Sequence, residues 1–464
     1  QYLRDKLGAL AFDAAVAVAR GAVLSLLSSI EVGTLVLVDE AYGERHVFGQ
    51  LTTTSTTTGI NGNRLGSKGY GDAPHVTLTV TSATFYLRLL LLADMGFAAA
   101  YLLAEVRCAD LTGFFRLFIR NRAALNNGST GWSSAVLVLL ARSGGGNTMS
   151  NALLNAAAHY DLGNGMFAAF LSPDMTYSCP IWGSAGGAGF GGQDKEEEAL
   201  EAAQMRKLHR VIGQARIKTS DHVLEIGTGW GSFAIEAVKA TGCRVTTLTL
   251  SREQKAWAEE RVRAKGLQDH VQVLLMDYRA LPVPAVPYDK IVSIEMLEAV
   301  GKEFLGTYFG CVDKLLKREG GIAVFQCITM PEGRHQAYSQ RTDFINEYIF
   351  PGGYLPSVTQ LLNHIATESK GTLIVENVEN IGGHYARTLR LWKEQFLARF
   401  DDKIRPALLE EHPGMGDDEV DVFRRKWEYY FTYSEAGFLT KTLGDVIITV
   451  GREGAMELME GIPV

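Results

Sequence analysis

A glycine-rich turn between a short apolar segment and a helix places the strongest constraint on the fold of this 464-residue chain. The segment His222 to Ile226 is apolar apart from its acidic residue Glu225 and the polar His222, and the turn that follows reads Gly227-Thr228-Gly229-Trp230-Gly231. Glycine lets the backbone pass close to a ligand where a Cβ would collide, and a helix that begins there presents free N–H groups. The pattern predicts a strand, a turn and a helix that form a nucleotide-type cofactor pocket.

The spacing of these glycines argues against two common cofactor loops. A dinucleotide fingerprint needs the spacing G-x-G-x-x-G and an acidic residue at the end of the next strand. The glycines here do not have that spacing, and the next predicted strand, Cys243 to Leu250, does not end in an acidic residue. A phosphate loop needs Lys-Ser or Lys-Thr after the glycines, and neither follows. An acidic residue before the turn suits a small cationic ligand with an adenosine moiety, which indicates S-adenosylmethionine. The alternative is a tight turn with a purely structural role.

Charge and cysteine content narrow the functional class. The net charge of -7 gives no general attraction for nucleic acid, so we expect no nucleic-acid partner. A basic face at Met205 to Lys218 either meets phospholipid headgroups or, as we favour, is a solvated helix face. The five cysteines are scattered, with no C-x-x-C pair and no cysteine–histidine spacing typical of zinc. We therefore expect a reducing compartment and no metal.

No membrane span or signal peptide is expected from the sequence. The first residues lack a charged-then-apolar leader, although a segment can precede them. Leu87 to Leu103 is apolar but contains Arg88 and Asp94, and it is shorter than the ~20 residues that cross a bilayer. Any membrane contact is therefore expected to be peripheral.

The chain divides into two predicted domains. Residues 1–145 form an N-terminal α+β domain, with strands at Gly33 to Asp39 and His75 to Val80 and helices within Phe85 to Asn121. The Gly/Ser/Asn-rich stretches around residues 126–131 and 142–147 place the boundary near residue 145. Residues 146–464 form the second, catalytic domain.

From Asp221 onward, strands and helices alternate, which predicts a doubly wound α/β fold around a mostly parallel sheet. The expected strands are Val223–Ile226, Cys243–Leu250, Val271–Met276, Lys290–Met296, Ile322–Ile328 and Asp445–Val450. In such a sheet, ligands bind at the carboxyl ends of the strands. The residues expected there are Gly227, Thr249, Asp277, Glu295, Glu298 and Gln326.

Four stretches resemble the cyclopropane fatty acid synthase family, in its plant and fungal branch. They are His159–Asn164 with Met175–Cys179, Ile294–Gly301, Tyr348–Gly353 and Glu379–Leu389. Residues 1–145 resemble the family's N-terminal domain more loosely. The resemblance implies the seven-stranded sheet of class I S-adenosylmethionine-dependent methyltransferases. It also implies an enzyme that methylenates a cis double bond of an unsaturated phospholipid at a membrane surface. We therefore expect a cytoplasmic, peripherally membrane-associated protein whose N-terminal domain helps lipid docking or homodimerisation.

The resemblance also implies a catalytic site in which a bound bicarbonate ion deprotonates a carbocation so that the ring closes. Its cage falls on Cys179, Glu298, Gln326, the backbone of Ile328, and Tyr385. Two positions depart from the bacterial pattern, because Ala299 and Gln326 stand where histidines are usual. A third, Gly165, stands where the family usually has an acidic residue.

For S-adenosylmethionine, the resemblance and the residue chemistry agree. Gly227 and Gly229 allow close approach, and Glu225 orients the backbone that meets the amino group. The remaining residues expected to bind the cofactor are Tyr160, Tyr177, Ser178, Thr249, Leu250, Gln254, Asp277 and Tyr278.

Each assignment has a structural alternative. Taken singly, Cys179 is a buried thiol, Glu298 a helix-start carboxylate, Tyr385 a core aromatic and Gln326 a partner for backbone groups. A cysteine protease pairing Cys179 with His159 has no supporting motif. Three functional alternatives remain, namely a lipid methyltransferase that leaves a methyl branch, an N-methyltransferase of an amphiphilic small molecule, and an inactive binding module.

Overall fold

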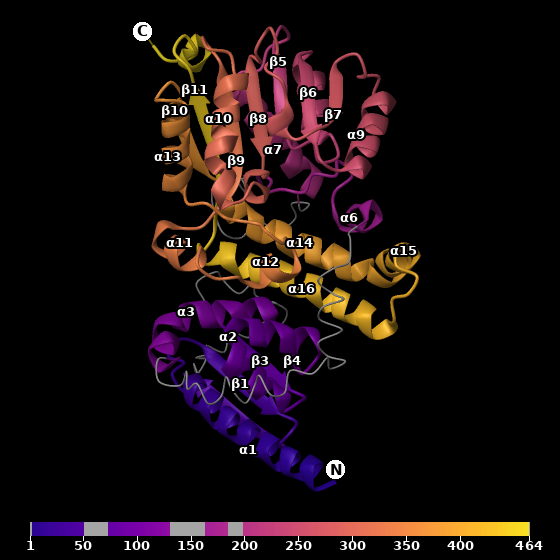
Figure 1. The fold of residues 1–464 in the computed structure, drawn as a ribbon, viewed down its shortest axis with the longest axis vertical. Helices are drawn as coiled ribbons and strands as arrows, with labels where there is room; N and C mark the ends of the chain where they lie inside the picture. The colour runs from indigo at the N-terminus through magenta and orange to yellow at the C-terminus, as the bar shows by residue number, and fades with distance from the viewer. Residues whose placement is uncertain (1, 51–72, 130–162, 184–197, 464) are drawn as a thin grey trace, which may run out of the picture. The chain divides into compact units, whose positions relative to one another are not determined.

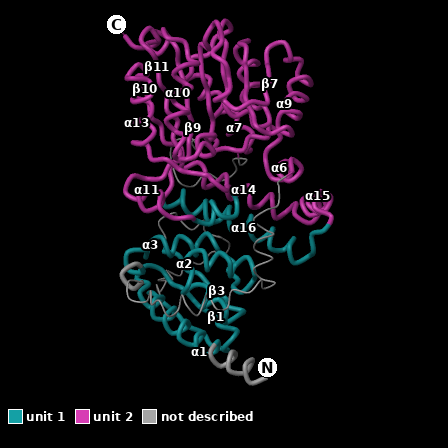
Figure 2. Tube along the Cα trace, viewed as in Figure 1, with its two compact units in different colours: residues 1–161, 343–349, 414–440 teal, residues 162–342, 350–413, 441–464 magenta. Residues whose placement is uncertain are grey.

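The computed structural model describes residues 2–50, 73–129, 163–183 and 198–463 (Figure 1). They form two compact units, coloured separately in Figure 2. Unit 1 comprises residues 1–161, 343–349 and 414–440, and unit 2 comprises residues 162–342, 350–413 and 441–464. The predicted boundary near residue 145 lies outside the described residues. Residues 343–349 and 414–440, which the sequence placed with the catalytic domain, belong to unit 1.

Unit 1 contains a small four-stranded sheet with strand order β2-β1-β3-β4. Its central strands alternate between buried and more exposed side chains, as expected for a sheet with one covered face. The strands are β1 (Thr34–Asp39), β2 (Glu44–Gly49), β3 (His75–Val80) and β4 (Val106–Cys108). The helices are α1 (Tyr2–Leu27), α2 (Thr84–Leu102), α3 (Leu111–Ser129), α12 (Phe344–Tyr348) and α16 (Asp417–Leu439).

Among the described residues, helix α2 alone has the length and apolar composition of a membrane span. Half of its apolar stretch is buried in the structure. Its backbone leaves helical geometry at Ala93, where φ is 50° and ψ is -123°. These features fit a core helix, because a lipid-exposed helix keeps its backbone hydrogen bonds within the segment.

Unit 2 is built on a mostly parallel seven-stranded sheet, which confirms the predicted fold class. The strand order is β10-β11-β9-β8-β5-β6-β7, with β11 antiparallel to both of its neighbours. The strands are β5 (His222–Ile226), β6 (Arg244–Thr249), β7 (Val271–Leu275), β8 (Lys290–Ile294), β9 (Ile322–Thr329), β10 (Ile374–Asn380) and β11 (Gly444–Gly451). Strand β10 is an edge strand with mostly exposed side chains, so it carries no apolar alternation by which the sequence predicts it.

The order of this sheet reverses between β5 and β8. The chain runs from β5 to β6 and β7 on one side, and from β8 to β9 on the other. Because crossovers between parallel strands are right-handed, the helices that follow β5 and β6 are expected on the face opposite to the helix that follows β8. Figure 1 shows the helices α9 and α10 beside this sheet. The helices of the unit are α6 (Asn164–Phe170), α7 (Leu200–Gln214), α8 (Ser232–Thr241), α9 (Arg252–Ala264), α10 (Leu305–Leu315), α11 (Glu332–Tyr338), α13 (Val358–Glu368), α14 (Tyr385–Ala398) and α15 (Arg405–Glu411). The reversal creates a crevice at the carboxyl ends of β5 and β8, where ligands bind in such sheets.

Candidate active site

The glycine turn lies at the carboxyl end of β5 and has the backbone that its sequence predicts. Gly227 and Gly229 have φ values of 105° and 51°, a region that favours glycine. The backbone N–H groups of Gly227 and Thr228 donate to the carbonyl of Leu248 at 3.0 and 2.9 Å, which ties the turn to β6. A Cβ added at Gly229 would meet no atom within 4 Å. The turn therefore offers open space beside its backbone, as a bound cofactor requires.

Glu225, in the strand before the turn, is 3% exposed. Its Oε2 has no hydrogen-bond partner among the described residues. Burial raises the pKa of this carboxyl to about 8, opposed by a hydrogen bond with Thr247 and by the charge of Lys207. A buried polar atom without a partner calls for an explanation, and a cationic ligand at the adjacent turn supplies one. The surroundings of Glu225 thus fit S-adenosylmethionine.

The raised pKa of Glu225 predicts a specific dependence of stability on pH. The folded chain keeps a proton that the unfolded chain releases between pH 4.5 and about 8, so stability falls as pH rises through this window. The expected slope from this group is up to about 1.4 kcal/mol per pH unit. Glu225→Gln cannot ionise and should remove that slope. Urea unfolding of both proteins at pH values of about 5.5 and 7.5 measures it, and parallel pH dependences would contradict the assignment.

Residues expected near the ribose and adenine lie at the ends of β6 and β7. Thr249 donates its hydroxyl hydrogen to Oε1 of Gln254 at 2.9 Å. Ser251 accepts a hydrogen bond from the backbone of Gln254, which confirms the predicted helix start. Asp277 caps a short turn and pairs with Arg279 at 2.6 Å. Of the two other residues in this set, Leu250 is 73% exposed and Tyr278 stacks edge-on against Tyr308.

The residues expected to close over the methionine end lie on the segment before α7. Tyr177 packs against Phe167 and Trp392, with ring centroids 5.2 and 5.0 Å apart. Ser178 accepts a hydrogen bond from Lys207 at 2.6 Å. Tyr160 lies outside the described residues. An apolar aromatic wall therefore stands next to the polar cluster described below.

Three of the predicted cage residues meet around one carboxylate, that of Glu295. The backbone N–H of Cys179 donates to Oε1 at 2.7 Å, and the amide of Gln326 donates to the same oxygen at 2.8 Å. The hydroxyl of Tyr385 donates to Oε2 at 2.7 Å. The loop before α7, strand β9 and helix α14 thus converge on a residue that follows β8.

The other two cage residues contact each other. The backbone N–H of Ile328 donates to Oε1 of Glu298. Oε2 of Glu298 is buried without a partner among the described residues. Burial and the nearby charge of Glu295 raise the pKa of Glu298 well above its usual range. The structure therefore brings together the five residues on which the resemblance places the cage.

We define the carboxylate cluster as Glu295, Glu298 and Asp445 with their hydrogen-bond donors. Asp445 is its third carboxyl group, and Lys207 is a buried cation near it. Asp445 on β11 is fully buried and accepts a hydrogen bond from Gln326 at 3.1 Å. Burial and the charge of Glu295 raise its pKa well above the ordinary value. Lys207 is also fully buried, and burial lowers its pKa despite the carboxylates around it. The sequence predicts a solvated face for Met205 to Lys218, and this prediction is wrong for Lys207, whose side chain is buried and bonds Ser178.

These contacts test whether the carboxylate cluster fits the bicarbonate ion that the resemblance implies. The hydroxyl of Tyr385 and the amide of Gln326 bond Glu295, and the N–H of Ile328 bonds Glu298. An additional anion would therefore lie among buried carboxyl groups whose donors are in use, at a considerable electrostatic cost. The unpartnered Oε2 of Glu298 could meet a bicarbonate hydroxyl, but the donors that would hold the oxygens of the ion already bond carboxylates. The cluster as it stands therefore does not fit bicarbonate.

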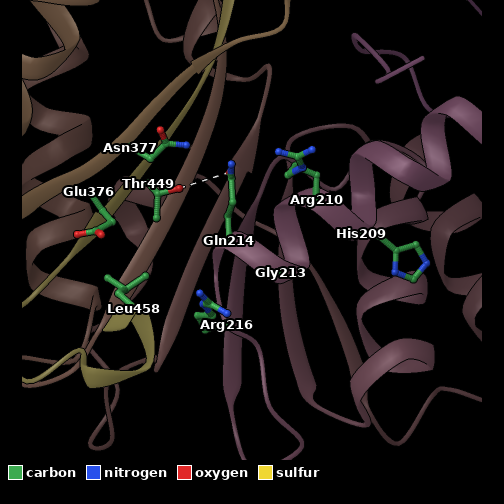
Figure 3. Close-up of a pocket in the computed structure, with 9 residues that line it drawn as sticks. All are labelled: His209, Arg210, Gly213, Gln214, Arg216, Glu376, Asn377, Thr449 and Leu458. Atoms are coloured by element: carbon green, nitrogen blue, oxygen red, sulfur yellow. Dashed lines mark hydrogen bonds between the residues drawn. The ribbon is translucent and has the colours of Figure 1, made fainter. Parts of the chain in front are cut away.

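The remaining cations of the basic face are neutralised by neighbouring carboxylates. Arg210 pairs with Glu379 at 3.1 Å, and Lys218 pairs with Glu457 at 2.9 Å. Arg206, His209 and Arg216 have acidic partners as well. Figure 3 shows the hollow beside these residues, where Thr449 bonds Gln214. This geometry favours a solvated face over a site for phospholipid headgroups.

The chain is similar to proteins that modify lipids. Residues 148–447 match the family described as mycolic acid cyclopropane synthetase. A tuberculostearic acid methyltransferase of Mycobacterium tuberculosis is 38% identical over 360 residues, 78% of this chain and 79% of the relative. The cyclopropane-fatty-acyl-phospholipid synthase of Escherichia coli is 31% identical over 404 residues, 85% of this chain and 93% of the relative.

The chain is also similar in fold to solved structures of methyltransferases. A mycolic acid cyclopropane synthase complexed with SAH and CTAB superposes with a TM-score of 0.53 at 26% identity, over 65% of this chain and 98% of the other. A coclaurine N-methyltransferase bound to SAH superposes with a TM-score of 0.55 at 19% identity, over 77% of this chain and 98% of the other. The second likeness concerns the fold alone.

Proposed function

The chain belongs to the mycolic acid cyclopropane synthetase family, and from that premise we propose that it forms a cyclopropane ring on a cis double bond of an unsaturated phospholipid acyl chain. It is an S-adenosylmethionine-dependent methyltransferase with lipid-acting relatives. The observation that supports the proposal most strongly is the carboxylate cluster near the glycine turn, at the edge of the sheet where the strand order reverses.

Positioning is the first demand of this chemistry. An isolated alkene is a weak nucleophile, and S-adenosylmethionine supplies an electrophilic methyl group. Holding the two groups in line contributes up to about 7–11 kcal/mol in favourable cases. The glycine turn and Glu225 fit the cofactor, while the aromatic wall at Tyr177 offers an apolar surface for a hydrocarbon chain.

Control of the resulting carbocation is the second demand. The cation must be kept from water and must lose a proton. Tyr177, Trp392 and their aromatic neighbours exclude water on one side, and the carboxylate cluster offers proton acceptors. Because the cluster does not fit bicarbonate, the chain's own carboxyl groups are the acceptors that we consider.

A second candidate is a lipid methyltransferase that leaves a methyl branch. The 38% identity to a tuberculostearic acid methyltransferase favours it. Both reactions share the methyl transfer and differ in which proton the cation loses. N-methylation has no comparable support, since the coclaurine N-methyltransferase shares the fold alone.

We further propose that the enzyme works on the cytoplasmic side of a membrane as a peripheral protein, with unit 1 serving lipid docking or dimerisation. Lipid-acting relatives support a lipid substrate. Sedimentation with liposomes, for the full chain, tests the membrane proposal.

Transfer of label from methyl-labelled S-adenosylmethionine to vesicles tests the proposed function. We expect label in vesicles of cis-monounsaturated phospholipid, and none in matched vesicles whose acyl chains are saturated. A product with upfield cyclopropane protons in its NMR spectrum supports ring formation, whereas label in a branched chain supports the second candidate. Label transferred to a small amine alone would refute both.

A further inference from the structure

Glu295 occupies the position that the family resemblance gives to an exogenous anion. Its two carboxylate oxygens accept hydrogen bonds from Cys179 N–H, the Gln326 amide and the Tyr385 hydroxyl, at 2.7, 2.8 and 2.7 Å. These are the donors expected to hold bicarbonate. A carboxylate has the planar O–C–O group that bicarbonate would present to them. The chain thus supplies from its own sequence the anion that the donors require.

Glu295 is one of the two partly exposed carboxyl residues of the carboxylate cluster, the other being Glu298. Cys179, Gln326 and Asp445 are fully buried behind it, whereas Glu295 is only partly buried. The next residue, Met296, lies against the glycine turn, because a Cβ added at Gly227 would be 3.2 Å from its side chain. Glu295 therefore lies one residue before a side chain that contacts the glycine turn.

The backbone of Glu295 has a conformation that costs free energy. Its φ of 46° lies in the left-handed region, which costs a non-glycine residue about 1–3 kcal/mol. The backbone N–H of Glu295 donates to the carbonyl of Gln326 at 2.8 Å, which holds this geometry. Such strain is common at functional sites, where the surrounding structure maintains it.

The neighbouring groups of Glu295 differ from those of its two partners in the cluster. Burial and repulsion by the nearby Glu295 raise the pKa of both Glu298 and Asp445. Glu295 accepts three hydrogen bonds, which stabilises a carboxylate anion. Lys207, buried nearby, interacts electrostatically with Glu295 and Asp445.

We propose that the Glu295 carboxylate is the base that removes the proton from the methylated lipid cation, in place of bicarbonate. This inference rests on the proposed function. The alkene π electrons form the new bond to the methyl carbon, and the S–C electron pair stays on sulfur. Glu295 then takes one proton from the new methyl group, and the C–H electron pair closes the ring. A hydrogen-bonded carboxylate is a weak base, but it suffices because a carbocation is a very strong acid.

Two substitutions at Glu295 test this step. Glu295→Gln fills the same volume without accepting a proton, and we expect kcat to fall by about 100-fold or more. Glu295→Gly fits the positive φ without strain and vacates the carboxylate's volume. We expect Glu295→Gly to be similarly slow in CO2-depleted buffer and to regain activity when bicarbonate or formate is added. Glu295→Gln should show no such rescue.

The wild-type enzyme and one control variant complete the experiment. Wild-type turnover should be unchanged by bicarbonate depletion. Glu410→Gln, at an exposed position of α15, should behave as wild type. Calorimetry should show that both Glu295 variants still bind S-adenosylmethionine. Loss of wild-type activity without bicarbonate, or near-normal turnover of Glu295→Gln, would overturn the inference. A wild-type protein that forms no lipid product at all would instead refute the proposed function.

Discussion

Replacing Lys207 with methionine is expected to lower the free energy of unfolding by about 1–3 kcal/mol. Lys207 is fully buried, donates to Ser178 at 2.6 Å and interacts electrostatically with Glu295 and Asp445. Methionine retains much of the side-chain volume but removes the charge that interacts with Glu295 and Asp445, and it leaves the Ser178 hydroxyl without its donor. Urea unfolding at neutral pH measures the loss.

A double-mutant cycle separates this charge effect from a packing defect. Adding Glu295→Gln to Lys207→Met should restore part of the lost stability, because the Glu295 charge that interacts with Lys207 is then removed as well. Lys239→Met serves as the control, since Lys239 forms an exposed pair with Glu236 and should change stability by less than about 0.5 kcal/mol. Strictly additive losses in the cycle would contradict the proposed electrostatic coupling.

Replacing Gly227 with valine is expected to weaken S-adenosylmethionine binding by about 100-fold or more. A β-branched residue is strained at the φ of 105° found here, and its Cβ would lie 3.2 Å from the side chain of Met296. The turn must therefore move away from its position beside the cofactor.

Isothermal calorimetry of the Gly227→Val protein measures this loss. Gly333→Ala is the matched control, because Gly333 lies in helix α11 with nothing within 4 Å of an added Cβ. Its affinity should equal that of the wild type. Wild-type affinity in Gly227→Val would show that the turn does not form the cofactor site.

The fold of unit 2 was predictable because the sequence patterns that indicate its strands, turns and helix starts are local. The apolar strand, the positive-φ glycines and the Ser251 cap each depend on a few consecutive residues. Edge strand β10 was missed because its exposed side chains leave no apolar pattern. The inclusion of residues 343–349 and 414–440 in unit 1 depends on tertiary contacts, which local periodicity does not encode.

The carboxylate cluster was predictable only in part. Glu295, Glu298 and Tyr385 all lie in recognisable motifs, but the central position of Glu295 depends on donors 31 to 116 residues away in sequence. The sequence did predict that Glu295, which follows β8, lies at the carboxyl edge of the sheet, where ligands bind. The sequence predicted the wrong environment for Lys207. A lysine on a charged helix is ordinarily solvated, but this side chain is fully buried.

Deuterium counting in the lipid product tests the central claim most directly. The purified full chain is given S-adenosylmethionine with a fully deuterated methyl group and vesicles of cis-monounsaturated phospholipid, and the acyl chains are examined by mass spectrometry and NMR. Removal of one methyl proton by the enzyme predicts a cyclopropane carbon that retains two of the three deuterium atoms. A product that retains all three in a methyl branch would contradict ring formation, and lipid without deuterium would contradict the proposed function altogether.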